Sequence, residues 1–110
     1  MNALRNKVQL IGNLGNDPEI INLESGKKLA KFSIATNESY RNGQGELVKE
    51  TQWHRVIAWG KTAAIIEKYL TKGAEVAIEG KLTNRMYETQ SGEKKYITEI
   101  VCNELLMLGK

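Results

Sequence analysis

A strand-forming stretch in the middle of the chain carries two tryptophans with an arginine between them. It runs from Glu50 to Lys61 as Glu-Thr-Gln-Trp-His-Arg-Val-Ile-Ala-Trp-Gly-Lys, where tryptophan, valine, isoleucine and threonine favour a β-strand. Because the side chains of a strand alternate between its faces, Trp53, Arg55 and Trp59 share one face. The opposite face consists of His54, Val56 and Ala58. We therefore expect the tryptophan face to be at least partly open, with flat indoles for stacking on bases and a guanidinium for phosphate.

Burial of both indoles in an ordinary sheet is the alternative interpretation, since tryptophan is usually well buried. The strand by itself supports a stacking surface and a core position equally. The choice between them depends on the rest of the chain.

Length and composition limit the classes of protein to consider. With 110 residues, 41% of them hydrophobic and 26% charged, residues 1–110 are expected to form a single soluble domain around one core. The net charge of +3 favours polyanionic partners only weakly. The lone cysteine, Cys102, is expected to be a buried small hydrophobic residue in a protein of a reducing compartment. No stretch has the apolar length of a signal peptide or a membrane span, which predicts a cytoplasmic protein with no membrane partner.

The hydrophobic pattern predicts an all-β protein with one short helix. The expected strands are Val8–Leu14, a short one at Ile20–Leu23, Leu29–Thr36, the tryptophan stretch, Glu75–Thr83 and Tyr96–Cys102. The helix is expected to follow the tryptophan stretch, with Thr62 as its N-cap and Tyr69 in its buried face. The polar segment Glu38–Lys49 is predicted to be a long hairpin loop with a mobile tip, and Asn84–Lys95 is predicted to be a second hairpin. If only the five longer strands are counted, the helix lies between strands 3 and 4. This order is the layout of a five-stranded OB-fold barrel.

Short motifs on this layout resemble those of the bacterial single-stranded DNA-binding protein family, the SSB family, over nearly the whole chain. The matching segments are Asn6-Lys7-Val8, Gly12-Asn13-Leu14-Gly15-Asn16-Asp17-Pro18-Glu19, Ala35-Thr36-Asn37-Glu38-Ser39-Tyr40, Trp53-His54-Arg55-Val56, Gly60-Lys61, Tyr69-Leu70, Lys72-Gly73 and Ile78-Glu79-Gly80. The resemblance implies a homotetrameric OB-fold that binds and protects single-stranded DNA of any sequence. Its expected setting is DNA replication, recombination and repair, in the cytoplasm and associated with the nucleoid.

The resemblance also implies which side chains contact DNA. Bases are expected to stack on four aromatic residues, namely Tyr40, Trp53, Trp59 and Tyr87. The family often has tryptophan at the first and last of these positions and phenylalanine at the third, and all three ring types stack. Basic residues near the aromatic ones are expected to contact phosphates: Arg55, Lys61, Arg85, Lys94 and Lys95. The alternative is a solvated surface for each of these charges and simple exposed tyrosine for Tyr40 and Tyr87.

The only histidine, His54, is expected at a subunit interface, where the matching histidine of the family lies. It has no cysteine, aspartate or histidine near it in the sequence, and the only aspartate, Asp17, lies in a predicted turn. A catalytic dyad or a metal site needs several converging groups. We therefore expect a protein that is no enzyme and has no catalytic residue, metal or cofactor.

The end of the chain departs from the family pattern. Full-length bacterial members continue past the barrel into a flexible linker with an acidic tip that recruits replication and repair enzymes. No acidic run follows Glu104 here, so either the C-terminal acidic tail has been removed or this member lacks one. Recruitment of partners through a tail is therefore not expected.

Two other functions fit part of the sequence. An accessory protein of replication restart that resembles primosomal protein N would share the OB-fold and form a dimer, but such proteins usually lack this set of aromatic residues. A metal-dependent nuclease on an OB scaffold is the second alternative. Incubating labelled single strands with magnesium and looking for shortened products separates it from a binding protein.

Overall fold

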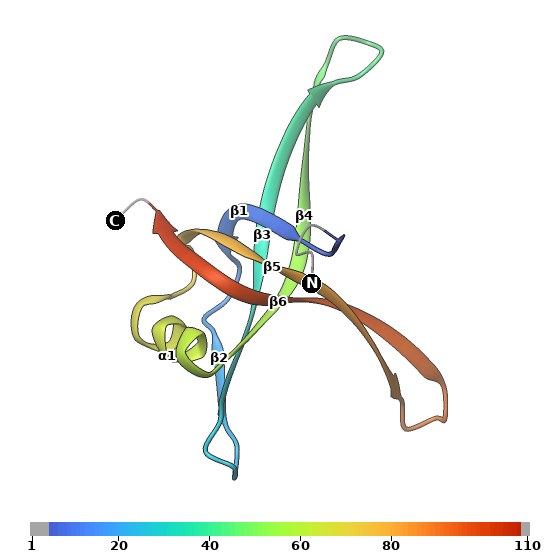
Figure 1. Cartoon of the computed structure of the whole chain (residues 1–110). Coiled ribbons are helices and arrows are strands. Elements are labelled where there is room, and N and C mark those ends of the chain that lie inside the picture. Colours follow the sequence, from blue (N-terminus) through green and yellow to red (C-terminus); the bar gives the residue numbers. More distant parts are fainter. Residues whose placement is uncertain (1–4, 109–110) are drawn as a thin grey trace.

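The computed structural model describes residues 5–108, which form six strands and one helix (Figure 1). In chain order these are β1 (Val8–Leu14), β2 (Glu19–Asn22), β3 (Lys28–Arg41), β4 (Leu47–Trp59), α1 (Gly60–Tyr69), β5 (Glu75–Glu88) and β6 (Lys94–Leu108). Within this described part of the chain, the helix is far too short to cross a membrane.

Five of the strands close into a barrel. The sheet order is β1-β5-β6-β4-β3-β2, and a further pairing of β1 with β3 joins the two sides of the sheet. The pairing between β4 and β6 is parallel and places Val56 beside Ile100, whereas the other pairings are antiparallel. The short β2 pairs with β3 at the edge of the sheet, outside the closed ring. The prediction of an OB-fold is confirmed, because α1 lies between the third and fourth strands of the barrel.

The core is built from the strand positions that alternate inward and from one side of the helix. Phe32 and Ile34 of β3 and Val56 and Ala58 of β4 are buried, as the period of two requires. The helix adds Ala63 and Ile66 to the same cluster, and Leu70, its C-cap residue, belongs to it as well. Cys102 is also buried, as predicted, and burial raises the pKa of its thiol to about 11, so it is a neutral packing residue at pH 7.

The prediction of a long loop at Glu38–Lys49 is wrong, whereas the hairpin predicted at Asn84–Lys95 is present with paired strands through most of its length. β3 and β4 stay paired out to Arg41 and Leu47, and β5 and β6 stay paired out to Glu88 and Lys94. Both pairs extend beyond the barrel as two-stranded ribbons (Figure 1). Their polar composition resembles that of a loop, but backbone hydrogen bonds and cross-strand side-chain pairs hold them extended. In each ribbon a threonine hydroxyl donates to an asparagine side chain at 2.7 Å: Thr51 to Asn37 and Thr98 to Asn84.

The helix begins and packs differently from the prediction. Trp59 is its N-cap and Thr62 lies within the first turn, because Gly60, with φ of +60°, lets the chain pass directly from β4 into α1. Tyr69 was expected in the core but is 54% exposed. The buried stripe of the helix is narrow, and Tyr69 lies beside it, with the Lys68 Nζ 5.3 Å from the centre of its ring.

Candidate nucleic-acid interface

The two indoles of β4 lie on the open face of the strand. Trp53 is 62% exposed and Trp59 is 43% exposed, while Val56 and Ala58 on the opposite face are fully buried. The alternation follows from the strand period, since only one face of β4 meets the core. Neither indole is therefore a core residue, and both present ring surface to solvent.

Trp53 rests against the backbone that follows β1. A Cβ atom added to Gly15 would lie 2.3 Å from the ring atom Cζ3 of Trp53, so the indole occupies the space that a side chain would need. Gly15 is itself held in place, since its N–H donates to the carbonyl oxygen of Ser33 at 2.9 Å. The glycine thus allows the indole to lie close to the barrel wall while most of the ring stays exposed.

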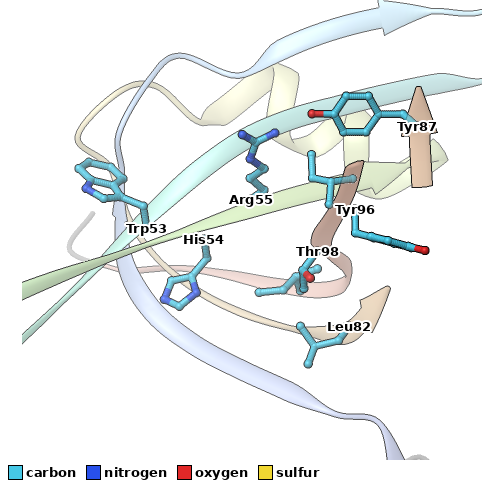
Figure 2. Close-up of a pocket in the computed structure, with 9 residues that line it drawn as sticks. Trp53, His54, Arg55, Leu82, Tyr87, Tyr96 and Thr98 are labelled. Carbon is cyan, nitrogen blue, oxygen red and sulfur yellow. The ribbon is translucent and has the colours of Figure 1, made fainter. Parts of the chain in front are cut away.

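A groove of about 400 Å³ separates this part of β4 from the β5–β6 ribbon (Figure 2). Trp53, His54 and Arg55 line it from β4, and Tyr87 and Tyr96 line it from the ribbon. We call this space the Trp53 groove. Sequence reasoning missed Tyr96, which is 76% exposed, because a tyrosine at the start of a strand resembles any strand-forming residue. Three aromatic side chains and a guanidinium therefore border one open groove.

A second groove, of about 360 Å³, lies on the other side of Arg55 and has Glu99 in its wall. We call it the Glu99 groove. The Arg85 guanidinium donates two hydrogen bonds to the Glu99 carboxylate, Nε to Oε1 at 2.9 Å and Nη2 to Oε2 at 3.1 Å. Glu99 is only 5% exposed, and this fork of hydrogen bonds, joined by the charges of Lys31 and Arg55, lowers the pKa of its carboxyl despite burial. Arg85, which is predicted to contact phosphate, is thus also the ion-pair partner of Glu99.

Sequence reasoning also missed Glu99 and Lys31. The signal for Glu99 was a carboxylate directly before the apolar residues Ile100 and Val101 of a predicted strand, where a buried charge needs a partner. The identity of that partner depends on the pairing of β5 with β6. Thr83 of β5 pairs with Glu99, and Arg85 lies two residues further along β5 on the same face.

The remaining predicted DNA contacts are more dispersed. Tyr40 is exposed on the β3–β4 ribbon opposite Val48, on the other face from Trp53. Lys61 lies in the first turn of α1, directly after Trp59 and Gly60. Lys95 pairs with Tyr87 and shares its face of the ribbon, whereas Lys94 pairs with Glu88 on the opposite face. The structure therefore brings Trp53, Arg55 and Tyr87 together and places Tyr40, Lys61 and Lys94 apart from them.

His54 leaves β4 in the direction opposite to Arg55 (Figure 2). Its Nε2 lies 3.0 Å from the hydroxyl oxygen of Thr36, and the side chain is half-buried. Among residues 5–108, no group of three or more histidine, cysteine, aspartate or glutamate side chains is placed to hold a metal ion. The histidine therefore has a hydrogen-bond partner, and in the described part of the chain it belongs to no metal-ligand cluster.

Comparisons with known proteins agree on one family. A family model described as the single-strand binding protein family matches residues 5–108. Single-stranded DNA-binding protein 1 of Chlorobaculum tepidum is 50% identical over 105 residues, a region that covers 94% of this chain and 65% of that protein. The chain thus spans slightly less than two thirds of the length of this relative. A solved structure of Plasmodium falciparum SSB in complex with ssDNA is similar with a TM-score of 0.89 and 39% identity, covering 94% of this chain and 95% of that one.

Proposed function

We propose, since the chain belongs to the single-strand binding protein family, that it binds single-stranded DNA of any sequence. The observation that carries the proposal is the open Trp53 groove, where two tyrosines, an indole and a guanidinium face the same space. The similar Plasmodium falciparum protein, whose structure was solved with ssDNA, supports it. By covering single strands the protein would serve DNA replication, recombination and repair, in the cytoplasm and in contact with the nucleoid.

The mechanism combines stacking with charge. Each base has a flat π face, so rings of Trp53, Trp59 and Tyr87 hold bases without reading their edges, at about 1–3 kcal/mol per stacked base. Tyr40 offers a further ring for stacking on the other face of the β3–β4 ribbon, apart from the Trp53 groove. Basic side chains of β4, the helix and the β5–β6 ribbon neutralise phosphates, which adds affinity that is independent of sequence. They are Arg55, Lys61, Arg85, Lys94 and Lys95. Such binding requires no bond to be broken, so the protein acts as a binding protein without a cofactor.

Tryptophan fluorescence tests the proposal directly. Titration with poly(dT), poly(dC) and poly(dA) should quench the fluorescence in each case, because indoles stacked on bases lose emission. Unchanged fluorescence together with no binding in a filter assay would reject single-strand binding. The same mixtures, incubated with magnesium and run on a denaturing gel, should show strands of unchanged length, whereas shortened strands would favour the nuclease.

We also propose that the chain assembles as a homotetramer, which the match to the family supports. The outer face of the sheet offers an apolar surface for such contacts. Ala77 of β5 pairs with Ile11 of β1 on one side and with Leu106 of β6 on the other, and both of these partners are exposed. His54 is assigned to an interface as well, on the face of β4 opposite Trp53. A dimer in solution would instead favour a protein similar to primosomal protein N.

Replacing His54 by lysine should loosen this assembly. A lysine at this half-buried position would bring a charge into a contact between subunits, and it would lose the bond to Thr36. Sedimentation of labelled protein diluted to nanomolar concentration should show smaller species for His54→Lys than for the parent. His54→Gln is the control, since a neutral amide can still bond to the Thr36 hydroxyl. A His54→Lys protein that keeps its full mass on dilution would rule out the interface role.

A further inference from the structure

The Glu99 groove contains more positive charge than its one ion pair uses. Lys31, Arg55 and Arg85 all border it, together with the carboxylates of Glu19 and Glu99. Lys31 and Arg55 lie on the same face of the sheet, because Lys31 pairs with Ile57 and Arg55 pairs with Ser33 across β3 and β4. Within residues 5–108 neither cation forms an ion pair shorter than 4.0 Å, although Glu19 lies opposite Lys31 on β2. Two cations are therefore available to a ligand in this groove.

Arg85 keeps part of its donor capacity while it is paired. A guanidinium has five N–H groups, and the two bonds to Glu99 use one on Nε and one on Nη2. The three others remain for a second acceptor, and the side chain is exposed. Glu99, by contrast, is buried and fixed within β6, so the carboxylate holds the plane of the guanidinium in one orientation.

Arg55 connects this charge to the stacking surface, since it borders both grooves. A strand with a base stacked on Trp53 would carry its backbone past Arg55 into the Glu99 groove. The charges there match a phosphate group, which accepts several hydrogen bonds at once from a fork of N–H donors.

We propose that the Glu99 groove seats one phosphate of the bound strand on Lys31, Arg55 and the free edge of Arg85, with Glu99 as the positioning residue of Arg85. The inference rests on the proposed single-strand binding. It adds Lys31 to the phosphate contacts. It also gives the Glu99 carboxylate a role in DNA binding, through the orientation of Arg85, although a negative charge by itself would repel a phosphate.

Replacement of Lys31 by glutamine tests the phosphate seat. On single strands each phosphate contact contributes about 0.7 to the slope of log K against log salt. Lys31→Gln should make the slope for poly(dT) shallower by about this amount. If the two proteins bind equally at 1 M salt, Lys31→Gln then binds about fivefold more weakly than the parent at 0.1 M salt. Lys27→Gln, in the exposed turn between β2 and β3, removes the same charge away from the groove and should leave the slope unchanged.

The outcomes separate this inference from the function on which it rests. If the parent protein fails to bind poly(dT), single-strand binding itself is wrong. If the parent binds and Lys31→Gln keeps the parental slope, or Lys27→Gln lowers it equally, the seat is wrong and binding stands.

The positioning role of Glu99 has a spectroscopic readout. In ¹⁵N-labelled protein the Nε–H of Arg85 should exchange slowly with water, and its signal should shift when a short oligo(dT) is added. Glu99→Gln removes the charge at nearly constant size, and the same signal should then exchange rapidly and the oligonucleotide should bind more weakly. If the Arg85 signal does not shift when the oligonucleotide is added, Arg85 forms only its ion pair and does not contact the phosphate. A signal that stays protected in Glu99→Gln would show that another group orients the guanidinium.

Discussion

Trp53→Ala should weaken the binding of poly(dT) by about 1–3 kcal/mol, or about 5- to 150-fold, while the melting temperature stays close to that of the parent. The indole is 62% exposed and belongs to the open face of β4, so its loss leaves no cavity in the core. The core face of the same strand, with Val56 and Ala58, is unchanged. Fluorescence titration of the remaining tryptophan and a thermal melt on the same sample measure both quantities.

A second substitution disturbs the same ring without removing it. In Gly15→Ala the new methyl group would overlap the Trp53 ring, which must move away from the barrel wall. We expect Gly15→Ala to bind poly(dT) more weakly than the parent. The double variant Gly15→Ala/Trp53→Ala should bind no more weakly than Trp53→Ala alone. A Trp53→Ala protein that melts far earlier than the parent but binds poly(dT) normally would identify Trp53 as a structural residue.

Gly80→Ala should destabilise the fold more than any exposed change considered above. Gly80 lies at the bulge where β5 shifts its register against β6, and an added Cβ would lie 2.0 Å from the carbonyl oxygen of Val101. The neighbouring atom is backbone, so β5 and β6 must separate locally, at a cost of about 1–3 kcal/mol or more. Urea unfolding at fixed protein concentration should show a lower midpoint.

Gly43→Ala is the matched control for this change. Gly43 lies in the turn between β3 and β4, has no neighbouring atom within 4 Å of a new Cβ and has no positive φ, so the midpoint should hardly move. Equal midpoints for the parent and Gly80→Ala would mean that β5 and β6 leave room for a side chain at the bulge, which would contradict their close approach there.

The barrel and the open face of β4 could be predicted because both follow from local pattern. The alternation of Trp53, Arg55 and Trp59 with Val56 and Ala58 determines which side meets the core, whatever the strand pairs with. The place of the helix among the longer strands then selects the OB-fold.

The ribbons could not be predicted in the same way, because no core pattern marks them. Residues 38–49 and 84–95 are mostly polar and show no regular alternation, so their strand form depends on pairing with a partner. Tyr69 was misplaced because its helical spacing fits a buried stripe, and only the packing of α1 on the barrel defines how wide that stripe is.

The grouping of the site also depends on pairing distant in sequence. Arg85 meets Glu99 across β5 and β6, and Lys31 reaches the same groove from β3. The positive charge of Arg85 follows from the sequence, whereas the carboxylate that occupies part of its guanidinium follows only from the pairing of β5 with β6. Residue type predicted the chemistry of the surface, and strand register determined which residues share it.

The salt dependence of single-strand binding tests the account most directly. The association constant for poly(dT) should be measured at several salt concentrations, beside a duplex of equal length. We predict that log K falls linearly with log salt, with a slope of about −0.7 for each phosphate contact, and that the duplex binds far more weakly because its stacked bases cannot reach the rings. An affinity that is independent of salt, or a duplex bound as tightly as the single strand, would contradict binding through exposed aromatic rings and basic side chains.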